Sequence, residues 1–177
     1  MDDNPIISND GALCWLRDGK LHRDNDLPAL IKADGSQWWF RDGIQHRDGD
    51  MPAVISSDGC VWVKNGRPCR DGDLPAVDNN FKKIWYIDGL KGRKGDLPAK
   101  VWSDGSQFWY KNGKLHREGG KPAFILSAQG DCPLEQRWYF EGYEIPENYA
   151  IKMQQRQQQR LLQLISKYKS KSKSKSC

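Results

Sequence analysis

The sequence has little of what an ordinary soluble enzyme or a membrane protein needs. Only 37% of its 177 residues are hydrophobic, and leucine is sparse before the C-terminal region. A two-layer core of aliphatic side chains is therefore not expected. No apolar run approaches the roughly 20 residues that cross a bilayer, and the acidic N-terminal residues lack the apolar segment of a signal peptide. We therefore expect an intracellular protein, cytoplasmic or nuclear, that is neither secreted nor transmembrane.

Cysteine is too scarce and too irregularly placed to hold the fold together. The cysteines are odd in number, form no CxxC pair and do not recur at a regular spacing: Cys14, Cys60, Cys69, Cys132 and Cys177. A disulfide framework or a structural zinc site is therefore not expected. We predict that the protein needs no cofactor or metal.

Acidic residues are missing from the C-terminal end. Residues 148–177 hold eight Lys/Arg and no Asp/Glu, which leaves 20 Lys/Arg against 23 Asp/Glu in residues 1–147. Such an asymmetry indicates a basic appendage directed at an anionic surface, rather than a uniformly basic fold.

What the chain has in excess is tryptophan, and six of its eight tryptophans mark a repeat. Successive spacings are 24, 23, 23, 24 and 29 residues, between Trp15, Trp39, Trp62, Trp85, Trp109 and Trp138. Each tryptophan is followed by a glycine at the fourth position; the first five also have an arginine at the eighth and Pro-Ala from the thirteenth. The seventh position is histidine in three units, at His22, His46 and His116, and Cys69 or Gly92 in the two others.

Two turn signals divide each unit. Asp-Gly and Asn-Gly dipeptides supply the positive φ values that tight hairpin turns require, and residues with high β propensity lie between them. Residues 53–56 and 123–126 are expected as one kind of strand and residues 106–111 as its partner. Because one unit cannot bury its own apolar face, stacked copies predict an all-β fold, an elongated antiparallel meander or solenoid of about six hairpin units over residues 9–146. We expect the repeated tryptophans to form a ladder of aromatic contacts inside it.

The unit resembles MORN-type repeats, and more closely a divergent MORN-like variant written W-Y-x-N-G-x-x-H-R-x-x-G-x-P-A. Residues 109–123 fit this pattern nearly throughout, and five aligned copies carry the resemblance across residues 9–146. Similar repeats are abundant in large DNA viruses of amoebae, marseilleviruses among them, and in some bacteria. The resemblance implies a scaffold for protein–protein interaction, with phospholipid binding sometimes proposed, and for a viral protein the host cell would be the compartment.

The three histidines are the first candidates for chemistry. They occupy one position in different units, so in a stack they would lie about 10 Å or more apart, too distant to act together. We interpret His22, His46 and His116 as structural residues that pack or hydrogen-bond within their units. No other group of residues combines a nucleophile, a base and an orienting group, so no enzymatic activity is expected.

The loop after each arginine superficially resembles a calcium-binding loop, as in residues 24–26, 48–50 and 71–73. Calcium requires six to eight oxygen ligands, whereas Leu-Pro or Met-Pro follows the second aspartate. The favoured interpretation is a turn whose arginine pairs with an acid of a neighbouring unit. A stripe of arginines that binds phosphates is the alternative.

The sixth unit ends the repeat. An insertion at residues 131–137 delays Trp138, and we interpret this unit as a cap that covers the open edge of the sheet. Residues 147–168 then change to helical spacing, with apolar residues on one face at Leu161, Leu164, Ile165 and Tyr168. This amphipathic helix is expected to dock on the end of the sheet; the alternatives are a helix that forms a homodimer and one that lies on a membrane.

Residues 169–177 alternate lysine with serine before the final cysteine and are expected to be disordered. The candidate anion-binding side chains are Lys167, Lys169, Lys171, Lys173 and Lys175. They would contact nucleic acid or an acidic protein, or less favourably an anionic membrane. A nuclear-targeting signal and a merely solubilising tail are the alternatives.

Together these patterns predict a non-enzymatic repeat scaffold. It would bind a protein partner through its repeats, while the basic tail contacts nucleic acid or directs the protein to the nucleus. Peripheral association with anionic membranes is the second hypothesis, and an enzyme is the third.

Overall fold

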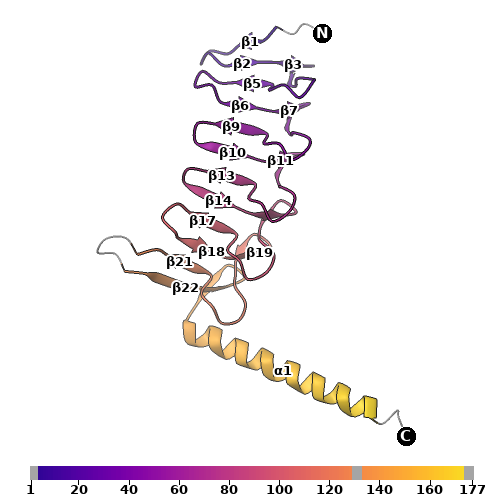
Figure 1. Ribbon diagram of the computed structural model, residues 1–177, viewed down its shortest axis with the longest axis vertical. Helices are drawn as coiled ribbons and strands as arrows, with labels where there is room; N and C mark the ends of the chain where they lie inside the picture. Colours follow the sequence, from indigo (N-terminus) through magenta and orange to yellow (C-terminus); the bar gives the residue numbers. More distant parts are fainter. Residues whose placement is uncertain (1–3, 129–132, 174–177) are drawn as a thin grey trace.

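The computed structural model describes residues 4–128 and 133–173, with side chains as far as residue 167. It confirms the expected fold class: a long antiparallel meander with one C-terminal helix, whose units succeed one another from the N-terminal end to the base (Figure 1). The main sheet has thirteen strands and two open edges. In order they are β1 (Ile6–Ile7), β2 (Leu13–Cys14), β5 (Leu30–Ile31), β6 (Gln37–Trp38), β9 (Val54–Ser56), β10 (Gly59–Val61), β13 (Val77–Asn79), β14 (Lys82–Ile84), β17 (Lys100–Trp102), β18 (Gln107–Phe108), β21 (Phe124–Leu126), β22 (Glu135–Phe140) and β23 (Tyr143–Ile145).

A second, shorter hairpin follows each main-sheet hairpin in the first five units. These small hairpins form separate two-stranded sheets, and we number the units one to six by their tryptophans. The small strands are β3 (Leu16–Arg17) with β4 (Lys20–Leu21), β7 (Phe40–Arg41) with β8 (Ile44–Gln45), β11 (Val63–Lys64) with β12 (Arg67–Pro68), β15 (Tyr86–Ile87) with β16 (Leu90–Lys91), and β19 (Tyr110–Lys111) with β20 (Lys114–Leu115).

The repeated tryptophan is the point at which the chain passes from the main sheet to the small hairpin. The single strand expected over residues 106–111 is therefore wrong, because the chain breaks at Trp109 into β18 and β19. The Trp109 N–H donates to the carbonyl of Ala123 at 2.8 Å, and its own carbonyl accepts from the N–H of His116 at 3.0 Å. These two bonds serve different hairpins, so the backbone bends between them. In the sixth unit β22 instead runs unbroken through its tryptophan.

The glycines of the small hairpins are required by backbone geometry, as the sequence predicts. At the turn of the fifth unit, Asn112 has φ of 51° and Gly113 of 77°, and paired positive values define the tight turn that matches strand twist. The glycine also makes room for the unit before it. A Cβ on Gly113 would lie 3.5 Å from the Leu90 side chain, and one on Gly89 would lie 3.2 Å from Arg67.

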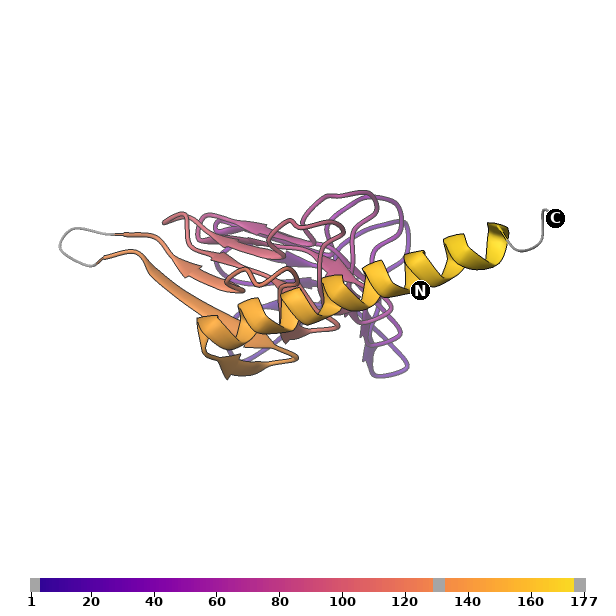
Figure 2. The same ribbon diagram turned by 90° about the horizontal axis from the view of Figure 1, so that it is seen from below.

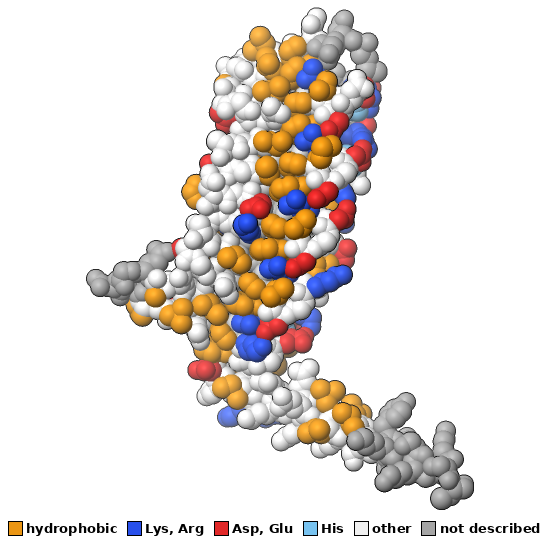
Figure 3. Space-filling view, in the orientation of Figure 1, with side chains coloured by type: hydrophobic (Ala, Val, Ile, Leu, Met, Phe, Trp, Pro, Cys, Tyr) orange, Lys and Arg blue, Asp and Glu red, His pale blue; other side chains and the backbone are white. Residues whose placement is uncertain are grey.

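Burial is concentrated along the line where the two kinds of hairpin meet. The alanines of the Pro-Ala pairs are fully buried: Ala29, Ala53, Ala76, Ala99 and Ala123. A cluster of Trp39, Ala53 and Val63 is flanked by partly buried Ile55 and Val61. Elsewhere most side chains of the main sheet stay partly exposed, and Figure 3 shows hydrophobic side chains gathered in a stripe along the repeats on the face in view. The repeats thus form a thin body with its core along one line.

The helix α1 (Glu147–Lys173) begins where the sequence predicts and ends five residues later than the expected limit at residue 168. It crosses beneath the end of the sheet, and its C-terminal part extends beyond the repeats (Figure 2). Only its first two turns pack against them: Ala150 is buried, and Met153 and Gln154 are partly buried. This part of the helix lies close against the end of the stack. A Cβ on Gly120 of the fifth loop would lie 2.7 Å from the Gln154 side-chain oxygen.

The expected docking of the whole amphipathic helix is wrong beyond these turns. The apolar side chains of the later part are 50 to 66% exposed, at Leu161, Leu162, Leu164 and Ile165. The helix points away from the body there, so its apolar face is left largely uncovered by the part of the chain that the structure describes. Among the described residues no helix is both long and apolar enough to cross a membrane. Of the tail expected to be disordered over residues 169–177, residues 169–173 belong to α1, and 174–177 lie outside the described residues.

Candidate interaction surfaces

An arginine covers the face of each repeated tryptophan in the first five units. The guanidinium carbon lies 3.6 to 3.9 Å from the ring centroid in the pairs Arg23–Trp15, Arg47–Trp39, Arg70–Trp62, Arg93–Trp85 and Arg117–Trp109. The predicted ladder of tryptophan–tryptophan contacts is therefore wrong. Successive units are two strands apart, about 9.6 Å, whereas aromatic pairs meet with centroids at about 4.5 to 7 Å. That interval leaves room for a planar guanidinium, which stacks favourably on indole.

The same residues link each unit to the one before it. The indole N–H of Trp39 donates to the carbonyl of Asp26 at 3.0 Å, and equivalent bonds join Trp62, Trp85, Trp109 and Trp138 to the preceding loop. Arginines reach the same loops: Arg47 pairs with Asp26 at 2.8 Å and Arg117 with Asp96 at 2.6 Å. The acid of a neighbouring unit is thus the partner of the arginine, as the favoured interpretation of the loop expects.

The strongest of these ion pairs is at the fourth loop. Asp96 accepts hydrogen bonds from Arg117 and from Lys121, which lower the pKa of its carboxyl group to about 2. The carboxylates of the loops are therefore occupied by cations of the protein itself. Among the described residues no three His, Cys, Asp or Glu side chains are grouped to hold a metal ion.

Two of the three histidines form a bridge between successive units. In His22 the Nδ1 atom accepts the N–H of Asp42 at 3.0 Å, and Nε2 lies 3.0 Å from the carboxylate of Asp24. His46 repeats this arrangement with Asn65 and Asp48, at 3.1 and 2.9 Å. Because Nδ1 accepts, the neutral ring carries its proton on Nε2 and donates to the aspartate. The sequence suggested bonds within a unit; the bond to the following unit could not be found without knowing how the units stack.

His116 departs from this pattern. Its Nδ1 accepts the N–H of Glu141 at 3.2 Å, but the Glu118 carboxylate lies 4.0 Å from Nε2 and is bound by Lys111 at 2.5 Å. Nε2 of His116 is buried and has no hydrogen-bond partner within residues 4–128 and 133–173. Burial, reinforced by the charge of Lys111, lowers the pKa of this imidazole, so it is neutral near pH 7.

Lysines and aromatic rings share one face of the main sheet in units four and five. The strand register places Lys82 opposite Trp102, and Lys100 between Ile84 and Phe108. The Lys100 ammonium lies 4.3 Å from the Trp102 ring centroid and 4.9 Å from that of Phe108. Lys82 lies 5.5 Å from Trp102 and, from the adjoining small hairpin, Lys91 lies 5.5 Å from Tyr110. We call this set of six residues the lysine–aromatic cluster: Lys82, Lys91, Lys100, Trp102, Phe108 and Tyr110.

The three lysines of the cluster lack acidic partners. None of them forms an ion pair within the described part of the chain, in contrast to the loop arginines. Burial lowers the pKa of Lys100, and the charges of Lys91 and Lys82 lower it further. Like charges thus repel one another in a half-buried place where the described residues supply no counter-charge. This cluster could not be found from the sequence, because its members are brought together only by strand pairing.

Most of the basic side chains predicted to bind anions in the C-terminal tail lie outside the described residues. Lys167 lies on α1, and the side chains of Lys169, Lys171, Lys173 and Lys175 lie outside the described residues. The described cysteines Cys14, Cys60 and Cys69 are free thiols, and Cys132 and Cys177 lie outside the described residues.

Comparison with known proteins finds no relative of this chain: no family model, no curated protein and no solved structure matches it. Its function is therefore inferred from its own contacts. The surfaces that these contacts leave open include the lysine–aromatic cluster, the junction between the sixth unit and α1, and the exposed apolar face of α1.

Proposed function

We propose that the chain is a non-enzymatic repeat scaffold that binds an acidic protein partner along the face carrying the lysine–aromatic cluster. The observation that carries this proposal is that Lys82, Lys91 and Lys100 repel one another beside the partly exposed rings of Trp102 and Tyr110, without a counter-charge among the described residues. Elsewhere on the repeats arginines are neutralised by loop aspartates. A partner's carboxylates would supply the missing charge here.

The chemistry of the cluster suits a protein segment that combines acidic and apolar side chains. Charge complementarity guides association and selects the partner, while partly exposed rings such as Trp102 supply contact area at low entropic cost. A rigid stack of six units presents such a face without rearrangement. The resemblance to MORN-like repeats supports the same kind of scaffold.

The basic C-terminal segment has a second role in this proposal. Lysines from Lys167 onward would contact nucleic acid electrostatically, or direct the protein to the nucleus. Deletion of residues 167–177 should abolish salt-sensitive retention on DNA and leave the protein partner bound. With up to five phosphates contacted, log K should fall with log salt at a slope no steeper than about −4.5. DNA retention unchanged by the deletion would contradict this role.

The protein-binding role is tested by comparing two neighbouring lysines on opposite faces. Lys82 belongs to the cluster, whereas Lys83 points to the other face of β14 and pairs with Asp78 at 3.5 Å. Full-length protein, the triple variant K82Q/K91Q/K100Q and the control K83Q are used to capture partners from a cell extract, and the captured proteins are quantified. The partner should be retained by the wild type and K83Q, lost by the triple variant, and released by salt. Equal capture by the triple variant would refute the proposal.

Membrane association is the second candidate, and one observation favours it. The apolar side chains Leu161, Leu162, Leu164 and Ile165 are exposed on α1 directly before the lysine-rich end. An apolar helix face beside a basic segment is typical of helices that lie on anionic membranes. Flotation with vesicles of neutral and of anionic lipid tests this, with L161S/L164S as the variant. Absence of binding to both kinds of vesicle would eliminate this candidate.

The same helix face could instead join two copies of the chain. Analytical ultracentrifugation of the wild type and L161S/L164S separates the two cases, because a homodimer through residues 147–168 would dissociate in the variant without any lipid present. A monomeric wild type across the concentration range would refute the homodimer.

A further inference from the structure

A cavity of about 540 Å³ lies between the repeats and α1 at the base of the stack. It exists because the sixth unit lacks the arginine loop and the Pro-Ala strand start of the other units; after Ile145 the chain enters the helix instead. The fifth loop, the β22–β23 hairpin of the sixth unit and the first half of α1 form its walls. Its volume is in the range of small-molecule sites.

One residue of this wall carries a buried hydrogen-bond donor that has no partner among the described residues. The side chain of His116 is 6% exposed, lines the cavity, and its Nε2 atom has no hydrogen-bond partner. Because Nδ1 accepts the Glu141 N–H, the neutral ring carries its proton on Nε2. The equivalent atoms of His22 and His46 donate to aspartates. A buried donor without a partner carries an uncompensated desolvation cost, so a ligand that accepts this bond would regain that free energy.

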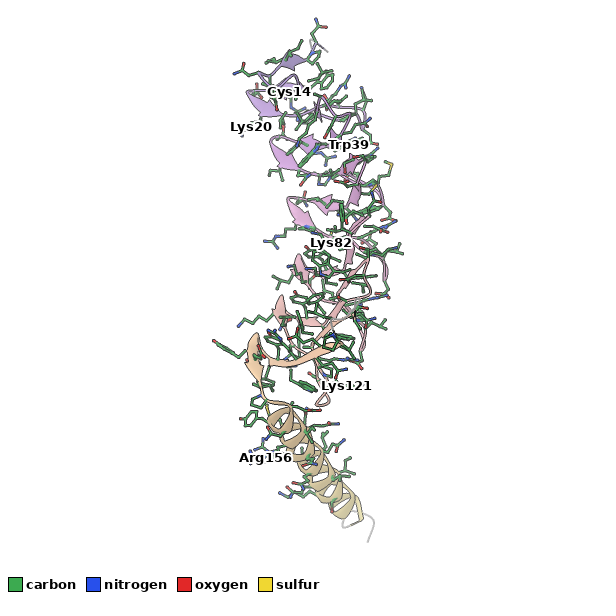
Figure 4. All side chains as sticks on the ribbon, turned by 90° about the vertical axis from the view of Figure 1, so that its left-hand side faces the viewer. Cys14, Lys20, Trp39, Lys82, Lys121 and Arg156 are labelled. Atoms are coloured by element: carbon green, nitrogen blue, oxygen red, sulfur yellow. The ribbon has the colours of Figure 1, made fainter. Side chains whose placement is uncertain are left out.

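The charge of the cavity wall is suited to an anion. Two arginines of α1, Arg156 and Arg160, line it, and neither forms an ion pair within the described residues; Figure 4 shows Arg156 on the helix below the repeats. The acids of the wall are Glu118, which Lys111 neutralises, and Glu141. Arg117 and Lys121 also contribute to the wall, although both pair with Asp96. Guanidinium groups present forked donors that match phosphate oxygens.

The rest of the wall is apolar and aromatic. Trp138, Phe140, Tyr149 and Met153 contribute to it, and the Phe140 ring lies 5.1 Å from the His116 ring. A bare phosphate ion would fill only a small part of the volume, so the lining suits a ligand with an organic body and an anionic end.

We propose that this cavity binds a small organic phosphate, whose phosphate accepts the Nε2–H of His116 and the guanidinium donors of Arg156 and Arg160 while its ring or apolar body contacts the aromatic wall. The site is independent of the proposed scaffold function: it shares no residue with the lysine–aromatic cluster. Binding would also fix the first half of α1 against the fifth and sixth units.

The test uses the full chain labelled with ¹⁵N and adenosine monophosphate as the probe, with inorganic phosphate, adenosine and anionic vesicles as separate arms. Affinity is measured by isothermal titration calorimetry, and the imidazole ¹⁵N signals report which histidine is contacted. The exposed residues Arg156 and Arg160 allow a variant, R156Q/R160Q, that leaves the repeats intact. Lys152→Gln is its matched control, because Lys152 lies on the same helix but not in the cavity wall. Glu118→Asp gives the fifth unit the His-Arg-Asp sequence of units one and two. The new carboxylate should accept the Nε2–H of His116 and so compete with the ligand for this donor.

We expect adenosine monophosphate to bind saturably. Binding should shift the His116 signal and leave the signals of His22 and His46 unchanged. R156Q/R160Q and E118D should each weaken it about tenfold or more, and K152Q should not. Phosphate alone should bind more weakly at the same site. Absence of saturation at millimolar probe, a His116 signal that does not move, or equal weakening by K152Q would overturn the proposal. Adenosine binding as well as its monophosphate would exclude a phosphate site, and a stronger shift with anionic vesicles would assign the site to a lipid headgroup.

Discussion

The second and the fifth units carry the same His-Arg dipeptide, yet the two sites differ in what surrounds them. In the second unit His46 is bonded at both ring nitrogens, and its loop carboxylate at Asp50 lies 3.2 Å from Arg70 of the unit that follows. In the fifth unit His116 lacks the second bond, and the position equivalent to Asp50 is Gly120, which faces α1. The polar side chains of an interior unit are therefore paired within the unit and with the next one. The fifth unit, near the end of the stack, instead retains a polar group without such a partner among the described residues.

This difference explains why the repeat itself carries so little chemistry. Tryptophan, arginine, histidine and the loop aspartates are engaged in joining one unit to the next, so their regular spacing reflects stacking and not a row of active sites. Side chains that are available to bind another molecule are found where the repeat pattern is interrupted. These places are the lysine–aromatic cluster in units four and five and the junction with α1.

The largest effect is expected from removing a repeat tryptophan in the interior. Trp39 is 5% exposed, holds Arg47 on its face and donates to Asp26, so Trp39→Ala should lower the free energy of unfolding by about 3 to 5 kcal/mol. Trp138→Ala in the sixth unit should cost clearly less, because this ring is only partly buried. Urea denaturation of the two variants measures both values. Equal losses would show that the last unit is as tightly integrated as the interior ones.

A smaller loss of stability is expected when a turn glycine is replaced by alanine, and the loss should be larger in an interior unit than in the first unit. Gly89→Ala places a Cβ at a φ of 78° and 3.2 Å from the Arg67 side chain of the preceding unit. Gly19→Ala is strained by its φ of 72° alone, because no unit precedes the first and nothing lies within 4 Å. We expect a loss of about 1 to 2 kcal/mol for G19A and a larger loss for G89A. Thermal unfolding of the two variants tests the order, and a reversed order would contradict the stacking contact.

The features that depend on residues close together in the sequence could be predicted from it. The turn dipeptides, the Pro-Ala strand starts and the register of six units follow from spacing alone, because each acts within a few residues. The contacts between units could not be obtained in this way. Successive units lie too far apart for their tryptophan rings to touch, and the arginine that covers each ring is eight residues away in sequence. The exposure of Leu161 on a helix that leaves the body depends on where α1 points, which no apolar pattern determines.

An increase in stability is expected from making the fifth unit resemble the first two. Glu118→Asp should bring a carboxylate within reach of His116 Nε2, as Asp24 and Asp48 are for their histidines at 3.0 and 2.9 Å. The new hydrogen bond should add about 0.5 to 1.5 kcal/mol to the free energy of unfolding near pH 7. The reverse change, Asp48→Glu in the second unit, should lower it by a similar amount. Urea titrations of both variants measure the differences; destabilisation by E118D would mean that His116 has no unmet donor.

The smallest effect is expected in the dependence of stability on pH. The folded protein holds the pKa of Asp96 at about 2, below its usual value, because Arg117 and Lys121 bind the carboxylate. The ionised form is therefore favoured by folding: this contribution is fully present above the pKa of about 3.9 in the unfolded chain and is lost as the pH falls toward 2. Since Asp96 is 46% exposed, solvent screening should keep the contribution below about 1 kcal/mol. Between pH 5 and pH 2 the free energy of unfolding should therefore fall less in Asp96→Asn than in the wild type, by that amount. The fifth loop has Gly120 in place of this aspartate and should contribute to the curve through Glu118, whose pKa Lys111 lowers. An unchanged slope in D96N would place the acid sensitivity elsewhere among the loops.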